Sequence, residues 1–216
     1  MNLQDLLEMP TFLPPTRGKT IDEEPGTYIS RKTAIRNYKQ IGKFPLYEPI
    51  GEHQYIDILM SNGGKLVEGI IPSTRPIHHD EGYRIVFSLM FKDELPNYLP
   101  PDLQHSNVVQ VDGVGTHKQF EGKGLATFVY FMLVKQGYTI ISDFRHEFGG
   151  LKLWRTLAKL AGLNNYVVNI LNNGEYIKDD KGNILSFNDG NYPKSKIWGT
   201  SPNEKHRNVL LVMRNV

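Results

Sequence analysis

The chain has 216 residues, of which 39% are hydrophobic, and 25 Lys plus Arg against 23 Asp plus Glu give a formal net charge of +2. This composition can fill a core and argues against a wholly disordered chain, and so small a charge argues against whole-molecule attraction to polyanions. The lack of cysteine excludes disulfides, thiolate metal sites and a cysteine nucleophile.

The start of the chain is acidic, with Asp5 and Glu8 among its first nine residues. No apolar run approaches the roughly 18 residues that a membrane-spanning helix needs. A chain without cysteine also suits a reducing compartment. We therefore expect a soluble, cytoplasmic protein with no targeting segment and no membrane partner.

Residues 1–50 are predicted to be irregular. Prolines recur there too often for a helix longer than a few turns, namely Pro10, Pro14, Pro15, Pro25 and Pro45. We expect an N-terminal arm or extension, wrapped over a domain formed by residues 51–216.

Four successive strands are predicted after this arm. Residues 55–60 and 66–71 flank a Ser-Asn-Gly-Gly turn and form a hairpin. A third strand is expected at 83–91 and a fourth at 107–114, separated by a proline-rich loop. This order predicts an antiparallel meander.

The period becomes helical after Gly115, because apolar residues at positions 125, 128, 129, 132 and 133 share one face, and Gly137 suits the helix end. A short strand at 138–143 and a helix at 150–161 follow. Further strands are expected at 166–171 and 208–213, with a small hairpin around Gly182. The whole predicts an α/β fold with a mixed, mostly antiparallel sheet flanked by helices.

The most informative motif is the stretch Glu-Gly-Lys-Gly-Leu-Ala at residues 121–126, where a loop becomes a helix. Glycines permit close approach of a ligand, and the free N–H groups of a first helical turn suit a phosphate. A tight turn without a ligand is the alternative. The Walker pattern is missing, and a dinucleotide-binding fold would place such a loop in an early strand–helix unit.

This motif resembles the pyrophosphate loop of the GNAT superfamily of N-acetyltransferases, Gln/Arg-x-x-Gly-x-Gly/Ala, which follows the family's fourth strand and leads into a helix. Glu121, Gly124 and Ala126 give one alignment, and Gln119, Gly122 and Gly124 give another. Residues 153–154, Leu-Trp, take the place of a Leu-Tyr or Phe-Tyr pair in the helix after the fifth strand.

The resemblance implies a sheet splayed at one parallel pair of strands, the fourth and fifth, with acetyl-coenzyme A in the wedge. It implies that the fourth-strand backbone holds the thioester and pantetheine, and that the glycine loop holds the pyrophosphate. The cofactor-binding residues so implied are Asp112, Gly113, Val114, Glu121, Gly122, Lys123, Gly124, Leu125 and Ala126.

Acid–base groups follow from the same resemblance, which implies a Glu on the fourth strand and a Tyr on the later helix. The acidic position aligns near Gln110, and Asp112 lies two residues on, on the same face of the strand. Asp112 is the candidate base, or else an exposed carboxylate. Because Trp154 cannot donate a proton, Tyr138 and Tyr166 are candidate acids, unless the thiolate leaves as the anion.

The histidines and a basic segment near the start of the chain are two further candidate binding features. His78 and His79 would diverge on a strand and chelate poorly, and His105, His117 and His146 are expected in exposed loops, so no metal is proposed. The segment 30–43, within the acid-free stretch 25–47, carries cations that suit phosphate contacts or a solvated face. These cations are Arg31, Lys32, Arg36, Lys39 and Lys43.

The expected function is transfer of an acetyl or related acyl group from coenzyme A to an amine of a small molecule or protein. Modification of a nucleobase is an alternative, because a family of phage DNA-modifying enzymes also resembles this fold and the basic arm could meet a duplex. A non-catalytic GNAT-like binding module is a third. The low net charge favours a structural wrap over nucleic-acid binding for the arm.

Overall fold

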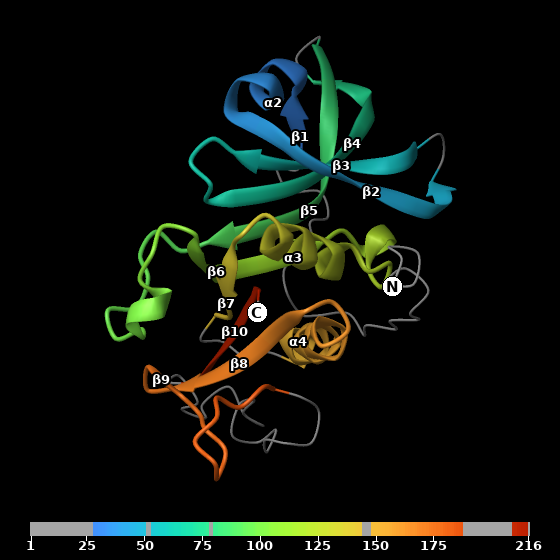
Figure 1. Cartoon of the computed structure of the whole chain (residues 1–216). Coiled ribbons are helices and arrows are strands. Elements are labelled where there is room, and N and C mark those ends of the chain that lie inside the picture. The colour runs from blue at the N-terminus through green and yellow to red at the C-terminus, as the bar shows by residue number, and fades with distance from the viewer. Residues whose placement is uncertain (1–27, 51–52, 78–79, 144–147, 188–208, 216) are drawn as a thin grey trace. The chain divides into compact units, whose positions relative to one another are not determined.

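The computed structural model describes residues 28–50, 53–77, 80–143, 148–187 and 209–215. Over these residues the chain forms ten strands and three α-helices (Figure 1). Two compact units can be distinguished. The N-unit comprises Asn2–Phe91 and Gly113–Val129, and the C-unit comprises Lys92–Asp112 and Tyr130–Val216. Strand β6 (Val108–Thr116) and helix α3 (Leu125–Lys135) each pass from one unit to the other.

Antiparallel strands build the sheet of the N-unit. Strands β2 (Tyr38–Ile50), β3 (His53–Ser61), β4 (Leu66–Ile77) and β5 (Asp80–Phe91) lie in this order, and the short β1 (Tyr28–Ser30) also pairs with β5. The predicted hairpin is therefore confirmed, with Gly64 in its turn at φ 68°. The predicted third strand is confirmed and begins three residues earlier than expected.

The expectation of an irregular arm is wrong for residues 28–50. Ser30 caps helix α2 (Arg31–Asn37), where its hydroxyl accepts the N–H of Thr33 at 3.1 Å. Strand β2 then pairs with β3 along most of its length, and Pro45 is tolerated because β2 is an edge strand. Residues 1–27, with the other four prolines, lie outside the described residues.

The two faces of the N-unit sheet are covered differently. The outer face, defined here as the face under α2, packs Leu59, Ile70 and Ile85 against Ala34. The inner face buries Phe44, whose ring lies 5.3 Å from that of Phe128 on α3. Alternation of side chains along each strand separates these two apolar sets.

A buried carboxyl group lies on the outer face. Glu68 is 6% exposed, and the hydroxyl of Tyr38 donates to it, whereas its Oε2 has no partner among the described residues. Burial raises the pKa of Glu68, and the Tyr38 hydrogen bond opposes part of that rise. Burial and the neighbouring carboxyl group also raise the pKa of Tyr38.

This carboxyl group makes stability depend on pH. A folded pKa above the ordinary 4.5 gives stability that is complete below pH 4.5 and is lost as the pH rises through the folded pKa. Glu68→Gln should therefore raise the Tm at pH 7 and flatten the Tm profile between pH 4.5 and neutrality. Thermal unfolding across this range tests it, with exposed Glu94→Gln as the control. A lower Tm for Glu68→Gln at pH 7 would contradict the assignment.

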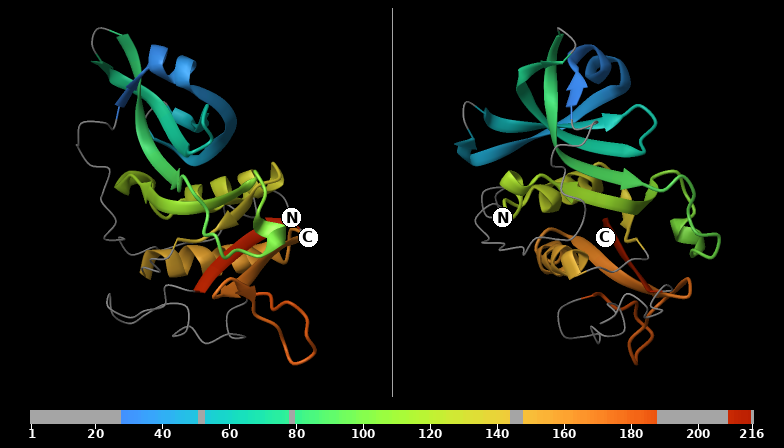
Figure 2. Two further views of the ribbon diagram at one scale, coloured as in Figure 1. Left: turned by 90° about the vertical axis from the view of Figure 1, so that its left-hand side faces the viewer. Right: turned by 180° about the vertical axis from the view of Figure 1, so that it is seen from behind.

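The C-unit sheet contains the parallel pair. Its strand order is β6, β7 (Thr139–Ile141), β10 (Val209–Asn215), β8 (Tyr166–Asn172) and β9 (Glu175–Tyr176). The C-terminal strand β10 lies between β7 and β8 and is antiparallel to both (Figure 2). Over the described residues of the two units, β6–β7 is the one parallel pair, so the predicted mixed, mostly antiparallel α/β fold is confirmed.

Both predicted helices are confirmed. Helix α3 ends before Gly137, which has φ 92°, and helix α4 (Phe148–Ala161) buries Trp154 and Leu157. The Trp154 ring meets Tyr130 of α3 edge-on at 5.8 Å. The strands expected at 166–171 and 208–213 are confirmed as β8 and β10.

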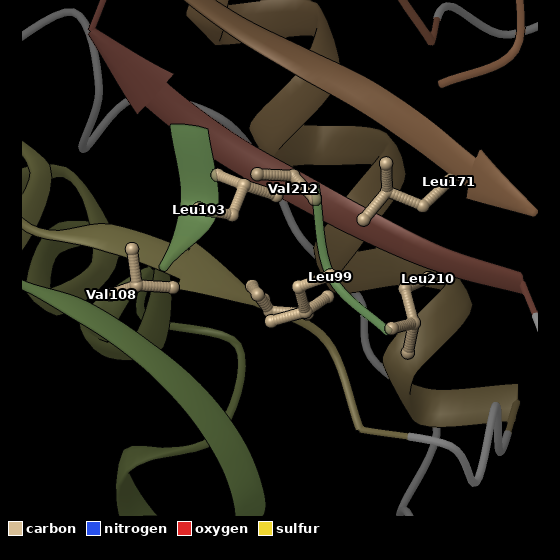
Figure 3. Packing of buried hydrophobic residues seen from close by; sticks show 7 residues of the cluster. Leu99, Leu103, Val108, Leu171, Leu210 and Val212 are labelled. Atoms are coloured by element: carbon tan, nitrogen blue, oxygen red, sulfur yellow. The ribbon is translucent and has the colours of Figure 1, made fainter. Parts of the chain in front are cut away.

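The proline-rich loop between β5 and β6 is packed against the sheet. It contains the short 3₁₀ helix η1 (Pro101–Leu103), and its Leu99 and Leu103 enter a cluster with residues of β6, β7, β8 and β10 (Figure 3). Asp102 accepts hydrogen bonds from Arg214 at 2.7 Å and from the Tyr176 hydroxyl at 2.8 Å. Apolar and polar contacts thus both hold this loop in place.

Candidate functional site

The glycine motif has the backbone of a ligand-binding turn. Gly122 and Gly124 adopt φ angles of 73° and 80°, which strain any residue with a Cβ. The carbonyl of Gly124 accepts the N–H of Phe128 at 2.9 Å, so Gly124 is the residue that opens α3. A glycine cap offers no side chain to the N–H groups of the first turn, which leaves these donors for an anion.

A buried histidine anchors the start of this turn. His117 caps the 3₁₀ helix η2 (Lys118–Phe120), and its backbone N–H donates to the carbonyl of Val86 in β5 at 2.8 Å. Its ring Nε2 contacts a guanidinium nitrogen of Arg84 in β5. The expectation that His117 is exposed is wrong, because it is 7% exposed and tied to β5.

The parallel strands part after three paired residues each. Pairing ends at Gln110 and Ile141, while β6 continues to Thr116. There the fully buried side-chain amide of Gln110 donates to the carbonyl of Ser142 at 3.1 Å and so replaces a backbone bond. The N–H of Ser142 donates to the carbonyl of Leu211 in β10 at 2.8 Å, and the N–H of Leu211 donates to Ser142 Oγ at 3.0 Å.

The amide oxygen of Gln110 is an unused acceptor. Gln110 Oε1 is buried and has no hydrogen-bond partner among the described residues. A buried acceptor without a donor costs free energy, so such a group in a folded protein calls for a role. The end of the parallel pair thus offers an acceptor oriented by β6.

The sequence-predicted residues of β6 follow directly along this strand. Asp112 and Val114 are exposed, and alternation places both on the same face of β6 as Gln110. Gly113 lies on the other face, where an added Cβ would come within 3.2 Å of the Met90 side chain. The glycine therefore suits a close packing position, and Asp112 is accessible to solvent.

The structure does not bring Tyr138 or Tyr166 to this end of the C-unit. Tyr138 directly precedes β7, and Tyr166 opens β8 opposite Asn215, with its ring 5.6 Å from Phe131. β7 and β8 run in the same direction, because both are antiparallel to β10. Both tyrosines therefore lie at the strand starts, whereas β6 and β7 part at the end of β7.

Some residues of interest were missed from the sequence. Asp143 follows Ser142 immediately after β7. Burial raises the pKa of Tyr130, and the charge of Asp143 adds to that rise. The sequence identifies Gln110 only as the position aligned with the family's acid, and it gives Arg84 no role. An arginine within a predicted strand can be recognised from the sequence alone. The roles of Gln110 and Asp143 depend on the register between β6 and β7, which the sequence does not show.

The remaining residues of the motif lie where the turn places them. Glu121, Lys123 and Ala126 are half-buried, and Leu125 is buried as the first residue of α3. His105 is exposed, while His78, His79 and His146 lie outside the described residues. In the part of the chain that the structure describes, no three His, Asp or Glu side chains gather closely enough to hold a metal ion.

Comparison with protein-family models, with curated proteins and with solved structures finds no match for this chain. Among the described helices, none is long and apolar enough to cross a membrane. Functional inference therefore starts from the geometry of β6, the glycine turn and α3.

Proposed function

We propose that the protein is a GNAT-like N-acyltransferase that transfers an acetyl or related acyl group from coenzyme A to an amine. The observation that carries this proposal is one continuous segment, in which a strand leaves its parallel partner and leads through a turn with two left-handed glycines into a helix. This order supports the resemblance on which the expectation of acetyl-coenzyme A rests.

The cofactor is held mainly by backbone in this proposal. The N–H groups of Lys123 to Ala126 bind the pyrophosphate, and the half-buried Lys123 adds positive charge. The N–H of Glu121 is not among them, because it donates to the carbonyl of Lys118 at 3.3 Å. Backbone of Asp112–Val114, beyond the last paired residue Gln110, binds the pantetheine and thioester. This backbone is available because β7 ends at Ile141.

The reaction joins the amine nitrogen to the acyl carbon and breaks the carbon–sulfur bond. Asp112 accepts the proton that the ammonium must lose, either directly or through water. Since Tyr138 and Tyr166 lie at the opposite ends of their strands, the thiolate leaves as the anion. Gln110 cannot act as a base, because an amide does not take up a proton at neutral pH.

Replacing Asp112 tests this assignment of the base. Asp112→Asn should lower turnover by about 10²-fold or more, the lower end of what a general base contributes, while coenzyme A affinity changes little. The matched control is Asp143→Asn, which removes the carboxylate that follows β7. Steady-state rates of both variants on an identified acceptor measure the two effects on turnover. Turnover within roughly threefold of wild type for Asp112→Asn would assign Asp112 to structure.

The function itself is tested by mass spectrometry of the purified protein under non-denaturing conditions, followed by incubation with acetyl-coenzyme A and a panel of amines. Bound coenzyme A and an amine product 42 Da heavier, the mass of an added acetyl group, support the proposal. A non-catalytic coenzyme A-binding module is the second candidate, which Gln110 favours because an amide stands where the family carries its acid. Tight cofactor binding without any product would select that candidate.

A further inference from the structure

The outer face of the N-unit carries exposed cations beside exposed tyrosines. Lys43 pairs with Asp57 and Pro45 with Tyr55 across β2 and β3, so all four lie on one face. Phe44 and Leu46 are buried, so alternation along β2 places Tyr47, which follows Leu46, on the same face as Pro45. Tyr47 is 67% exposed and Tyr55 is 52% exposed.

Helix α2 covers the same face and adds further positive charge. Its Ala34 packs on Leu59 and Ile70, while its cations Arg31, Lys32 and Arg36 are exposed. Lys39 does not belong to this set, because a register shift between Gln40 and Gly42 leaves it opposite Met60 on the inner face. The outer basic surface therefore comprises Arg31, Lys32, Arg36, Lys43, Tyr47 and Tyr55.

Few acidic side chains lie near these cations among the residues whose side chains the structure describes. Residues 28–47 contain no acidic side chain. Asp57 lies 3.5 Å from the Lys43 ammonium and also accepts from Gln40 at 2.8 Å, and Glu68 is buried.

The helix dipole does not favour part of this positive charge. Arg31 and Lys32 lie in the first turn of α2, where positive charge is unfavourable for the helix dipole. The mostly exposed rings of Tyr47 and Tyr55 also gain little from burial. Both features suit a ligand that brings negative charge and flat apolar surfaces together.

From this surface we infer that the N-unit binds single-stranded nucleic acid. The cations contact phosphates, and the rings of Tyr47 and Tyr55 stack on unpaired bases. A duplex offers the same phosphates but hides the faces of its bases, which makes it the weaker ligand. This inference does not depend on the proposed acyl transfer, because it uses no residue of the glycine turn or of β6.

Fluorescence anisotropy tests it with a labelled oligothymidylate of about 16 nucleotides, the upper site size of a single-strand-binding fold, and with a duplex of equal length. We expect the single strand to bind more tightly. Its log affinity should fall with log salt with a slope of about −3, for four phosphate contacts at about 0.7 each. Equal or tighter binding of the duplex, or no binding at about 50 mM salt, would overturn the inference.

Paired variants separate stacking from charge. Tyr47→Ala combined with Tyr55→Ala should weaken binding at least about tenfold, since stacking contributes about 1–3 kcal/mol per base, with little change in the salt slope. Tyr47→Phe with Tyr55→Phe keeps both rings and should bind like wild type. If this Phe pair loses as much affinity as the Ala pair, stacking is refuted.

Charge is tested by Arg31→Gln, Lys32→Gln and Arg36→Gln together, which should reduce the slope by about 2. The control carries the same loss of charge on exposed lysines of the C-unit, as Lys159→Gln, Lys178→Gln and Lys181→Gln. It should bind like wild type. Equal loss in both triple variants would show that net charge alone drives binding and would overturn the inference. Coenzyme A affinity, measured on the same proteins, reports separately on the proposed function.

Discussion

Replacing Gly124 with aspartate is expected to abolish coenzyme A binding. The residue opens α3 at φ 80°, where its carbonyl accepts the N–H of Phe128. An aspartate there would accept the N–H groups of the first turn with its own carboxylate, as helix caps do, and would so occupy the phosphate position. It would also repel the pyrophosphate.

The size of the loss follows from the bonds at stake. Hydrogen bonds to charged groups contribute about 1.5–3 kcal/mol each, so losing two of them lowers affinity by more than about 100-fold. Isothermal titration calorimetry with coenzyme A measures this change. The strain of a Cβ at positive φ costs about 1–2 kcal/mol and acts on stability, which thermal unfolding monitors separately.

Gly182→Asp is the matched control for this variant. Gly182 has φ 84°, and an added Cβ would meet nothing within 4 Å. The Gly182→Asp variant therefore introduces the same backbone strain and the same charge at a position far along the chain from α3. Its coenzyme A affinity should stay at the wild-type value. Wild-type affinity in Gly124→Asp, or no affinity in the wild-type protein, would refute the assignment of the glycine turn.

The elements whose signals are local could be predicted from the sequence. The period of apolar residues from Leu125 to Leu133 predicted α3, and the turn before Leu66 predicted the β3–β4 hairpin. Residues 28–50 could not be predicted in this way. Their regular structure depends on pairing with β3 and on the edge position of Pro45, and both are long-range properties.

The residues of the candidate site likewise differ in whether local sequence signals predict them. The glycine turn could be predicted because Gly122 and Gly124 lie close in the sequence to the start of helix α3, whose apolar period is itself a local signal. The Gln110–Ser142 contact joins residues 32 positions apart, and only the register of the parallel strands places them together. Tyr138 and Tyr166 were chosen by residue type, and the same register shows that they lie at the other ends of their strands.

The largest effect on stability is expected at Gly174, which follows β8 at φ 81°. An added Cβ would overlap the backbone carbonyl oxygen of Tyr98 and come within 2.9 Å of its ring. Strain at positive φ costs about 1–2 kcal/mol and overpacking about 1–3 kcal/mol, so Gly174→Ala should lower the free energy of unfolding by about 2–5 kcal/mol. Urea denaturation measures this loss as a lower midpoint with an unchanged slope.

Gly182→Ala separates the two causes, because it has the same backbone strain and no close neighbour, and it should cost only about 1–2 kcal/mol. Removing the Tyr98 ring as well, with Tyr98→Ala, should not rescue Gly174→Ala, because the nearest atom belongs to the backbone. The overlap must then push the loop away from β8 and withdraw Leu99 from its cluster with Leu171 and Leu210. Equal losses in Gly174→Ala and Gly182→Ala would show that the loop does not approach the β8–β9 turn so closely.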